Sequence, residues 1–228
     1  TFCCDYFISP AKRFNIFVDK FFFFFDMVWP AIHTRKKAKE ETPKMSNIFV
    51  DVGASSEREV LEMGIHPGTV LTFDDEFTEL NDRYYCGRAL DNRIGGYMIA
   101  ELARRLKESG HRPDYTLYIV NSVQEEVGLR GAQMIANRLK PDVALITDVT
   151  HDTATPMVDK IEQGDIRGGR GPVFTVGPSV HNRLRKFILD VCDKNDIPYQ
   201  HDAASRSTGT DTDAFAYSGA GVPSALLS

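Results

Sequence analysis

Apolar residues occur in two distinct patterns between residue 86 and residue 228. Short, nearly continuous apolar runs predict buried strands, and longer stretches with an apolar residue every three or four positions predict helices. The predicted helices span residues 93–109, 129–139, 179–195 and 213–219, and the predicted strands span 116–123, 143–149, 173–176, 197–200 and 223–228. Strands that alternate with helices in this way predict an α/β fold, in which a mostly parallel sheet is sandwiched by helices.

Shorter elements precede this region. The pattern predicts a strand at 46–54, a helix at 55–65 that has Ser55 or Ser56 as its N-cap, and a turn followed by a strand within 66–73. Short elements separated by turn residues are typical of a small β-rich domain. We therefore expect a β-rich domain over residues 29–85, followed by the α/β domain over residues 86–228.

The first 28 residues fit neither pattern. They contain five consecutive phenylalanines, Phe21–Phe25, bracketed by Lys20 and Asp26. We interpret residues 1–28 as a foreign or wrongly framed leader; the alternative is an unusual strand. Five apolar residues are far fewer than the roughly 20 that a membrane-spanning helix needs, so we expect no association with a membrane.

Composition and charge are those of an ordinary globular protein. Of the 228 residues, 42% are hydrophobic and 26% are charged, and the net charge is −5. A chain without a basic face lacks the electrostatic footprint of a nucleic-acid-binding protein, so we expect no nucleic-acid partner. The four cysteines lie at positions 3, 4, 86 and 192 without metal-ligand spacing. This cysteine usage fits a reducing compartment and predicts a cytoplasmic protein.

Carboxylates follow two of the predicted strands at the point where each strand ends. Glu125 and Glu126 come after the strand at 116–123, Asp148 lies at the end of the next strand, and Asp91 precedes a long helix. In open α/β sheets, functional groups gather beyond the carboxyl ends of the strands, so we expect these side chains on one rim. Each also has a simpler interpretation, as a helix N-cap, a solvated turn or a loop cap.

A shared rim would favour a metal site. Several carboxylates that converge repel one another and raise one another's pKa unless a cation lies among them. Carboxylate ligands with some imidazole suit zinc, cobalt or manganese. Neighbouring residues on an extended or turning backbone point in different directions. One of the paired glutamates can therefore bind a metal while its neighbour acts as a general base on water.

Five stretches, in this order along the chain, resemble the motifs of a known family: ALDNRIGG, VQEEVGLRGA, ITDVTHDTATP, GRGPV, and STGTDTDAF with GVPS. From about residue 30 onward the chain resembles the dinuclear-metal aminopeptidases. These are the glutamyl and deblocking aminopeptidases that form tetrahedral shells, some of which carry the label endoglucanase. The resemblance implies a zinc-exopeptidase-like fold with a PDZ-like insertion, which here would be residues 29–85. It also implies release of N-terminal residues from peptides with a free N-terminus, by homo-oligomers in which dimers build a dodecamer.

The resemblance also implies two divalent metal ions, zinc or cobalt, and a role for each carboxylate. Asp91 corresponds to the aspartate that bridges the two metals. Glu126 corresponds to a ligand of one metal and Asp148 to a ligand of the other. Glu125 corresponds to the general base.

Two histidine ligands of the family pattern have no counterpart in this sequence. One should precede the insertion, and the other should follow GVPS, beyond Ser228. We therefore expect a chain truncated at both ends, with two carboxylates left for each metal and with impaired activity. Asp211, in the stretch TGTDTDAF, is a candidate for holding a ligand in position; the alternative is a capped turn before the helix at Asp213.

Two other functions remain open on the sequence alone. The chain could be a non-catalytic remnant or an assembly subunit of the same fold, which would bind no metal. It could also be a glycoside hydrolase that uses a carboxylate pair such as Glu125 and Asp148. Chelation separates the last alternative from a metallopeptidase, because a glycosidase with two carboxylates needs no metal.

Overall fold

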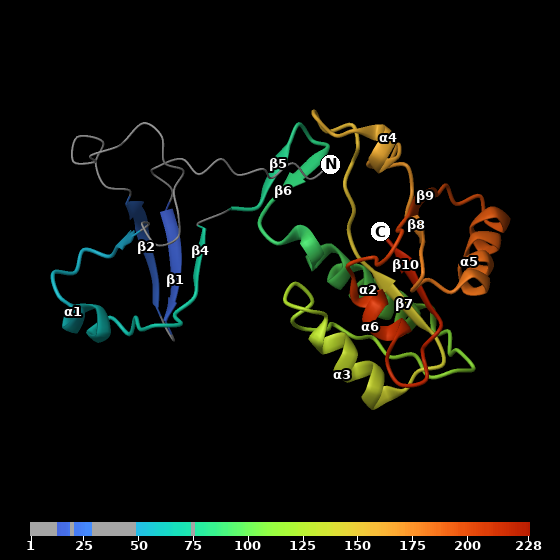
Figure 1. Ribbon diagram of the computed structural model, residues 1–228, viewed down its shortest axis with the longest axis horizontal. Coiled ribbons are helices and arrows are strands. Elements are labelled where there is room, and N and C mark those ends of the chain that lie inside the picture. Colours follow the sequence, from blue (N-terminus) through green and yellow to red (C-terminus); the bar gives the residue numbers. More distant parts are fainter. Residues whose placement is uncertain (1–12, 19–20, 29–48, 74–75) are drawn as a thin grey trace. The chain divides into compact units, whose positions relative to one another are not determined.

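A computed structural model describes residues 13–18, 21–28, 49–73 and 76–228 (Figure 1). The chain divides into two compact units, one that ends at Thr78 and one that runs from Glu79 to Ser228. The predicted border between residues 85 and 86 lies slightly beyond this division, and the domain assignment stays a prediction. Within the described residues, no helix is long and apolar enough to cross a membrane.

The first unit contains an antiparallel sheet of four strands in the order β3-β2-β1-β4. The strands are β1 (Arg13–Val18), β2 (Phe21–Val28), β3 (Phe49–Asp51) and β4 (Leu71–Phe73). Helix α1 (Glu57–Glu62) confirms the helix predicted at 55–65. Its N-cap is Ser56, whose Oγ accepts a hydrogen bond of 3.3 Å from the backbone N–H of Glu59.

The first strands of this sheet come from the stretch that we interpreted as a leader. β1 and β2 pair with each other in a register that runs from Arg13 opposite Asp26 to Val18 opposite Phe21. β2 also pairs with β3, and β1 with β4. This pairing agrees with the alternative interpretation, a strand. The foreign origin of the stretch stays a prediction, and residues 1–12, 19–20 and 29–48 lie outside the described residues.

The second unit contains the α/β elements, which follow a two-stranded sheet of β5 (Thr78–Leu80) and β6 (Tyr84–Cys86). Its helices are α2 (Leu90–Ser109), α3 (Arg130–Leu139), α4 (Lys160–Gln163), α5 (Asn182–Lys194) and α6 (Asp211–Ala216). Its strands are β7 (Ala144–Thr147), β8 (Val173–Val176), β9 (Gln200–Ala203) and β10 (Ser224–Leu227).

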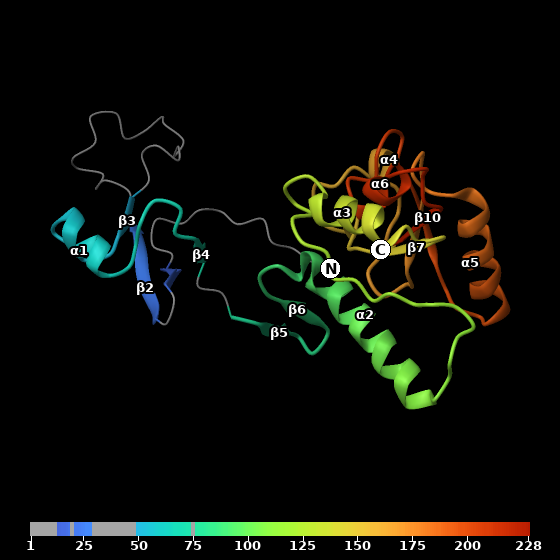
Figure 2. The ribbon, with the colours of Figure 1, turned by 90° about the horizontal axis from the view of Figure 1, so that it is seen from below.

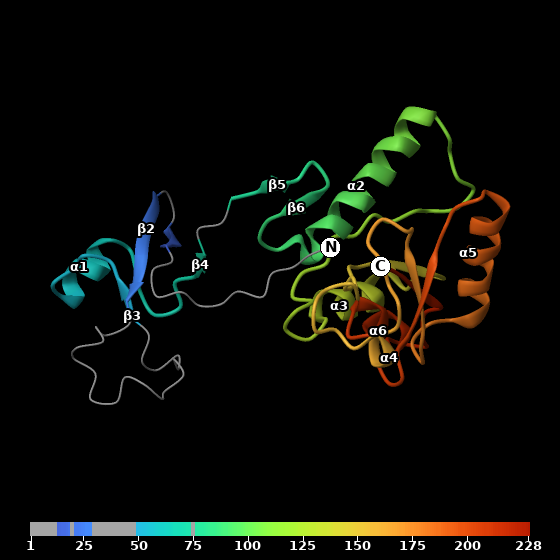
Figure 3. The same ribbon diagram turned by 90° about the horizontal axis from the view of Figure 1, so that it is seen from above.

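The four strands form a mixed sheet in the order β7-β10-β8-β9. β10 is parallel to β7 and β8 is parallel to β9, whereas β10 and β8 are antiparallel. Helices α3 and α6 lie on one side of this sheet and α2 lies on the other (Figures 2 and 3). The structure confirms the predicted α/β class, although the sheet includes one antiparallel pair.

The core lies where α6 packs on the sheet. In β7, Ala144 and Ile146 are buried and Leu145 between them is exposed, the period of two that defines a strand with one covered face. The buried cluster comprises Ala144, Ile146, Val180, Val222 and Leu226, with Phe215 of α6 packed against it. The packing of α6 on these side chains fixes the helix on which Asp211 lies.

Most of the predicted elements are present near their predicted bounds. The helix predicted at 93–109 is the regular part of α2, and it ends at Gly110, whose φ of 67° only glycine adopts without strain. The strand predicted at 173–176 is β8. The strand predicted at 197–200 is instead β9 at Gln200–Ala203, because its ladder with β8 starts only at Gln200, after Pro198.

The strand predicted at 116–123 is wrong for this structure. These residues form no strand with any other described residue, and Tyr118 and Val123 are 54% and 67% exposed. An apolar run becomes a strand only when a neighbour satisfies its backbone hydrogen bonds. Within the described sheet β7 pairs with β10 alone, so the run 116–123 has the composition of a buried strand without the pairing.

Phe174 on β8 is the largest fully buried side chain among the described residues, with 1% of its surface exposed, and its ring packs edge-on against Tyr199 at 6.0 Å. We expect Phe174→Ala to lower the free energy of unfolding by about 3–5 kcal/mol, because the substitution leaves a cavity. Urea denaturation measures the loss. Phe187→Ala on α5, where the ring is 65% exposed, is the control and should cost less than about 1 kcal/mol. Equal losses for the two variants would contradict this placement of the core.

Candidate active site

Glu125 and Glu126 lie in a tight loop between the run 116–123 and helix α3. The loop is closed by hydrogen bonds from the N–H groups of Gly128 and Leu129 to the carbonyl of Glu125, at 3.0 and 2.9 Å. Gln124 and Leu129, on either side of the glutamates, have φ angles of 61° and 56°. Left-handed conformations are unfavourable for residues with a side chain and concentrate at functional sites. The backbone therefore carries strain at the point where it presents these carboxylates.

Gly131, in the first turn of α3, fixes the other end of the loop. Its N–H donates to the carbonyl of Val123 at 2.9 Å. A Cβ at position 131 would lie 2.4 Å from that carbonyl oxygen, a distance that real Cβ atoms do not show. Only glycine allows this close approach, which explains the glycine in the stretch VQEEVGLRGA.

Asp91 lies at the start of α2, where the backbone is not yet helical (φ −83°, ψ 110°). The simpler interpretation of Asp91 as an N-cap is wrong, because the side chain that caps the regular part of α2 is that of Asn92. Asn92 instead accepts a hydrogen bond from the N–H of Gly95 and donates its Nδ2 to the carbonyl of Thr147, both at 2.8 Å. Asn92 thus ties the start of α2 to the end of β7.

Asp148 comes directly after β7 and is half-buried. Its backbone N–H donates to the carbonyl of Leu227 at 3.0 Å, which continues the parallel pairing with β10. Its Oδ1 accepts a hydrogen bond of 2.7 Å from the N–H of Val149. The bond from Asn92 to Thr147 therefore brings Asp91 and Asp148 to the same end of β7.

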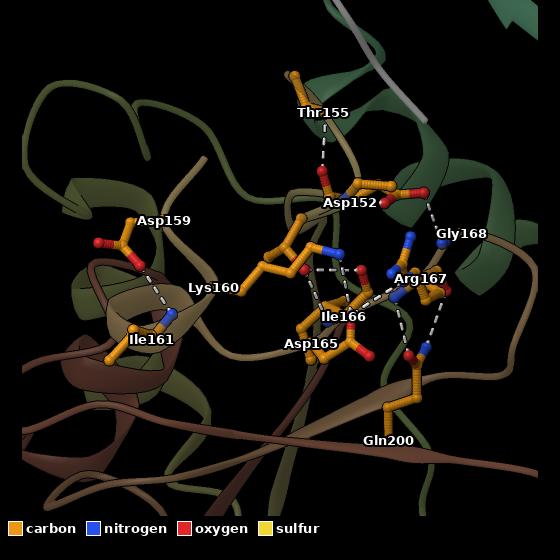
Figure 4. A network of polar contacts seen from close by, with 12 residues as sticks. Asp152, Thr155, Asp159, Lys160, Ile161, Asp165, Ile166, Arg167, Gly168 and Gln200 are labelled. Atoms are coloured by element: carbon orange, nitrogen blue, oxygen red, sulfur yellow. Dashed lines mark hydrogen bonds and ion pairs between the residues drawn. The ribbon is translucent and has the colours of Figure 1, made fainter. Parts of the chain in front are cut away.

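The segment 149–172, which connects Asp148 to β8, is held by polar contacts (Figure 4). Asp152 accepts a hydrogen bond from the N–H of Gly168 at 3.0 Å. The amide of Gln200, on β9, accepts from the N–H of Arg167 at 2.9 Å and donates to its carbonyl at 3.0 Å. Thr153 and Ile166, both buried, are joined by backbone and hydroxyl hydrogen bonds. The two ends of this connection are thus fixed to each other and to the sheet.

Asp211 is the first residue of α6. One of its oxygens, Oδ2, accepts a hydrogen bond from the hydroxyl of Ser122, and the other, Oδ1, is buried without a partner among the described residues. The alternative for the stretch TGTDTDAF, a capped turn before the helix, is present, but Asp211 does not form it. Thr210 is the N-cap of α6, and Asp213 accepts hydrogen bonds from the N–H groups of Thr208 and Gly209.

Burial and neighbouring negative charges raise the pKa of two carboxylates of the site, Glu125 and Asp148. Burial raises the pKa of Glu125 to about 7, with further contributions from the negative charges of Asp148, Asp211, Glu126 and Asp91. Burial also raises the pKa of Asp148 against the hydrogen bond from Val149, and the charges of Asp91, Asp211 and Glu126 raise it further. Glu125 and Asp148 are thus within electrostatic reach of Asp91, Glu126 and Asp211, and the charges that raise the pKa of Glu125 are all negative.

The described carboxylates are not grouped as a metal site. Within residues 13–18, 21–28, 49–73 and 76–228, no three or more His, Cys, Asp or Glu side chains are arranged so that they could hold a metal ion. The roles of Asp91, Glu126 and Asp148 as metal ligands stay predictions. The chemistry of the donors does fit a divalent cation, because carboxylate oxygens with unbalanced negative charge are what such an ion neutralises.

The sequence analysis did not identify the residues that hold the carboxylate-bearing segments in place. Asn92, Ser122 and Gly131 each make a contact that joins two segments, as described above. For Asn92 a signal existed: an Asn three residues before Gly95 has the spacing of a side chain that caps a helix start. Ser122 gave no such signal, because its partner lies 89 residues away in the chain.

An α/β sheet with a cluster of carboxylates at the ends of its elements is typical of metal-dependent hydrolases. The model of one family, described as M42 glutamyl aminopeptidase, matches residues 7–228. The chain belongs to this family.

Individual relatives agree with this assignment. The chain is 40% identical over 198 residues to the lysyl aminopeptidase of Pyrococcus furiosus, a match that covers 86% of this chain and 55% of that protein. It superposes with a TM-score of 0.86 and 29% identity on the TET aminopeptidase of the marine sediment archaeon Thaumarchaeota archaeon SCGC AB-539-E09, over 97% of this chain and 62% of that one. The TET1 peptidase of Pyrococcus horikoshii shares the fold alone, with a TM-score of 0.71 and 24% identity over 95% of this chain and 62% of that one. The chain thus spans about half the length of the curated relatives it matches.

The raised pKa of Glu125 makes the stability of the metal-free chain depend on pH. Its folded pKa of about 7 lies above the ordinary value of 4.5, so the folded state binds the proton more tightly than the unfolded state. The resulting stabilisation is present below pH 4.5 and is lost as the pH rises through about 7. We expect the free energy of unfolding, measured with urea and a chelator, to fall over this window.

The glutamine in Glu125→Gln cannot ionise, so the free energy of unfolding of this variant should fall less over the same pH window. Glu162→Gln, an exposed substitution on α4, is the control and should keep the full fall. If wild type and Glu125→Gln lose stability equally between about pH 5 and pH 8, the proposed environment of Glu125 is wrong.

Proposed function

We propose that the chain carries the catalytic site of a metal-dependent aminopeptidase. The observation that carries the proposal is the raised pKa of Glu125 and of Asp148, which lie on separate segments. Burial contributes most to both, and the negative charges of Asp91, Glu126 and Asp211 contribute further. Membership of the M42 glutamyl aminopeptidase family supports the reaction class. We further propose peptides with a free N-terminus as substrates, as the names of its aminopeptidase relatives suggest.

Two divalent ions, zinc or cobalt, would be held by the carboxylates other than Glu125. Asp91 would be shared between the two sites, Glu126 would belong to one and Asp148 to the other. When bound, such ions lower the pKa of water and stabilise the negative charge that develops on the carbonyl oxygen of the peptide bond being cleaved. Each ion would have two carboxylates from this chain, so we expect weak binding in the chain as it stands.

Glu125 would move the proton of the reaction. In the metal-free chain the pKa of Glu125 is raised to about 7, and bound cations would offset the surrounding negative charge and favour its carboxylate form. That form can take a proton from water and later return it to the departing amine. Without a metal, burial and then the negative charges of the surrounding carboxylates disfavour ionisation of Glu125. The same negative charge attracts the protonated N-terminus of a peptide.

Glu125→Gln separates the role of a base from that of a ligand. We expect this variant to lower kcat for release of an N-terminal residue from a peptide by about 10²–10⁴-fold. Bound zinc or cobalt, measured by elemental analysis, should not change. Glu126→Gln, one residue away, is the matched comparison and should lower metal content together with activity.

Three outcomes would count against these assignments. Loss of metal from Glu125→Gln would move Glu125 into the ligand set. Hydrolysis of a glycoside that survives a chelator would favour a glycoside hydrolase with two carboxylates, which needs no metal. A folded chain that forms a stable oligomer and binds neither metal would favour a non-catalytic assembly subunit.

We also infer that the protein forms a homo-oligomer. The inference draws on the TET1 peptidase of Pyrococcus horikoshii, which can assemble into a tetrahedron or a large octahedral shell. Sedimentation of the chain at several concentrations tests it, and a monomer at all of them would contradict it. The dodecamer, the contribution of a PDZ-like insertion to assembly and the cytoplasmic location remain parts of this proposal.

A further inference from the structure

The hydroxyl of Ser122 joins the loop of the paired glutamates to helix α6. Ser122 lies three residues before Glu125, and its Oγ donates to Oδ2 of Asp211, at the first position of α6. The two residues are 89 positions apart in the chain, so local folding does not bring them together. Both side chains are partly buried, which shields the contact from competition by water.

Asp211 has no other role that the described contacts reveal. It does not cap α6, because Thr210 does, and it does not close the preceding turn, because Asp213 does. Its second oxygen is buried without a partner. A buried carboxylate is costly unless something stabilises it, and the hydrogen bond from Ser122 lowers the pKa of Asp211 against the rise caused by burial.

The segment that enters the loop has little backbone support, although the loop itself is closed by bonds from Gly131 to Val123 and from Arg130 to Gln124. No backbone hydrogen bond joins residues 112–122 to the rest of the described chain, and no strand forms over 116–123. The left-handed Gln124 stores strain immediately before Glu125. Helix α6, in contrast, is fixed by Phe215 against the core and by Thr212, which is fully buried. A rigid helix therefore holds the weakly supported segment that leads into the loop.

We infer that Ser122 is a positioning residue, whose hydrogen bond to Asp211 fixes the direction in which Glu125 faces the other carboxylates. The inference rests on the proposed role of Glu125 as the base. Ser122 acts through the backbone between residues 122 and 125, and it need not touch a substrate. Asp211 serves as the fixed point on α6.

Hydrogen exchange of the metal-free chain tests the tether without any turnover. The N–H groups of Gly128 and Leu129, which both donate to the carbonyl of Glu125, report on the loop. We expect Ser122→Ala to speed their exchange about ten-fold, the size expected for a lost hydrogen bond to a charged group. Ser122→Thr retains the hydroxyl and should restore slow exchange.

The control is Ser218→Ala. Ser218, just after α6, donates its hydroxyl to the carbonyl of Ala214, a bond that does not involve the loop. This variant should leave the exchange of Gly128 and Leu129 unchanged. Unchanged exchange in Ser122→Ala, equal acceleration in Ser218→Ala, or failure of Ser122→Thr to restore the loop would each overturn the inference.

Kinetics separate this inference from the proposed function. In preparations saturated with zinc, Ser122→Ala should lower kcat about ten-fold and leave KM near that of wild type, because the base is misplaced. Glu126 lies in the same loop, so metal content is measured for both chains and kcat is compared at equal occupancy. An unchanged kcat with a loosened loop would overturn the positioning role. If wild type itself releases no N-terminal residue, the proposed function fails, and the exchange experiment still decides whether the tether exists.

Discussion

Mutual repulsion among carboxylates is the constraint on which this site depends. Glu125, Glu126, Asp148, Asp91 and Asp211 come from four segments of the chain, and the charges of the other four raise the pKa of Glu125. Like charges at close range favour a structure in which they separate. The fold opposes that separation with contacts behind the site: Asn92 to Thr147, Gly131 to Val123 and Ser122 to Asp211. Each of these contacts joins a segment that carries a carboxylate to another part of the α/β unit.

The backbone is also strained next to two of these carboxylates. Ala89 lies two residues before Asp91, and Gln124 lies immediately before Glu125; both are left-handed with a side chain. Such conformations cost about 1–3 kcal/mol each and persist only where the surroundings determine them. The burial of α6 and the close approach at Gly131 supply those surroundings. A cation among the carboxylates would relieve the repulsion and leave the geometry in place.

The sequence predicted the elements whose patterns are local. Gly110 ends α2 and Ser56 begins α1, because a cap needs only its own turn. The placement of Asp91 near Asp148 was expected from the ends of the α/β elements and agrees with the bond from Asn92 to Thr147, whereas the placement of Glu125 was inferred from a strand that does not form. The absence of the strand at 116–123 was not predictable, because strand formation depends on a neighbour that the pattern does not specify. The bond between Ser122 and Asp211 was equally hidden, because it joins residues that only the folded sheet brings together.

The stability of the chain at rising zinc concentration tests the central claim most directly. A ligand that binds only the folded state raises the unfolding free energy with its concentration. The account predicts that zinc raises the urea midpoint of the wild-type chain at neutral pH, and that it does so much less for a chain with Asp91→Asn and Asp148→Asn. A midpoint that zinc leaves unchanged, or raises equally in both chains, would contradict the claim that these carboxylates converge to hold a cation.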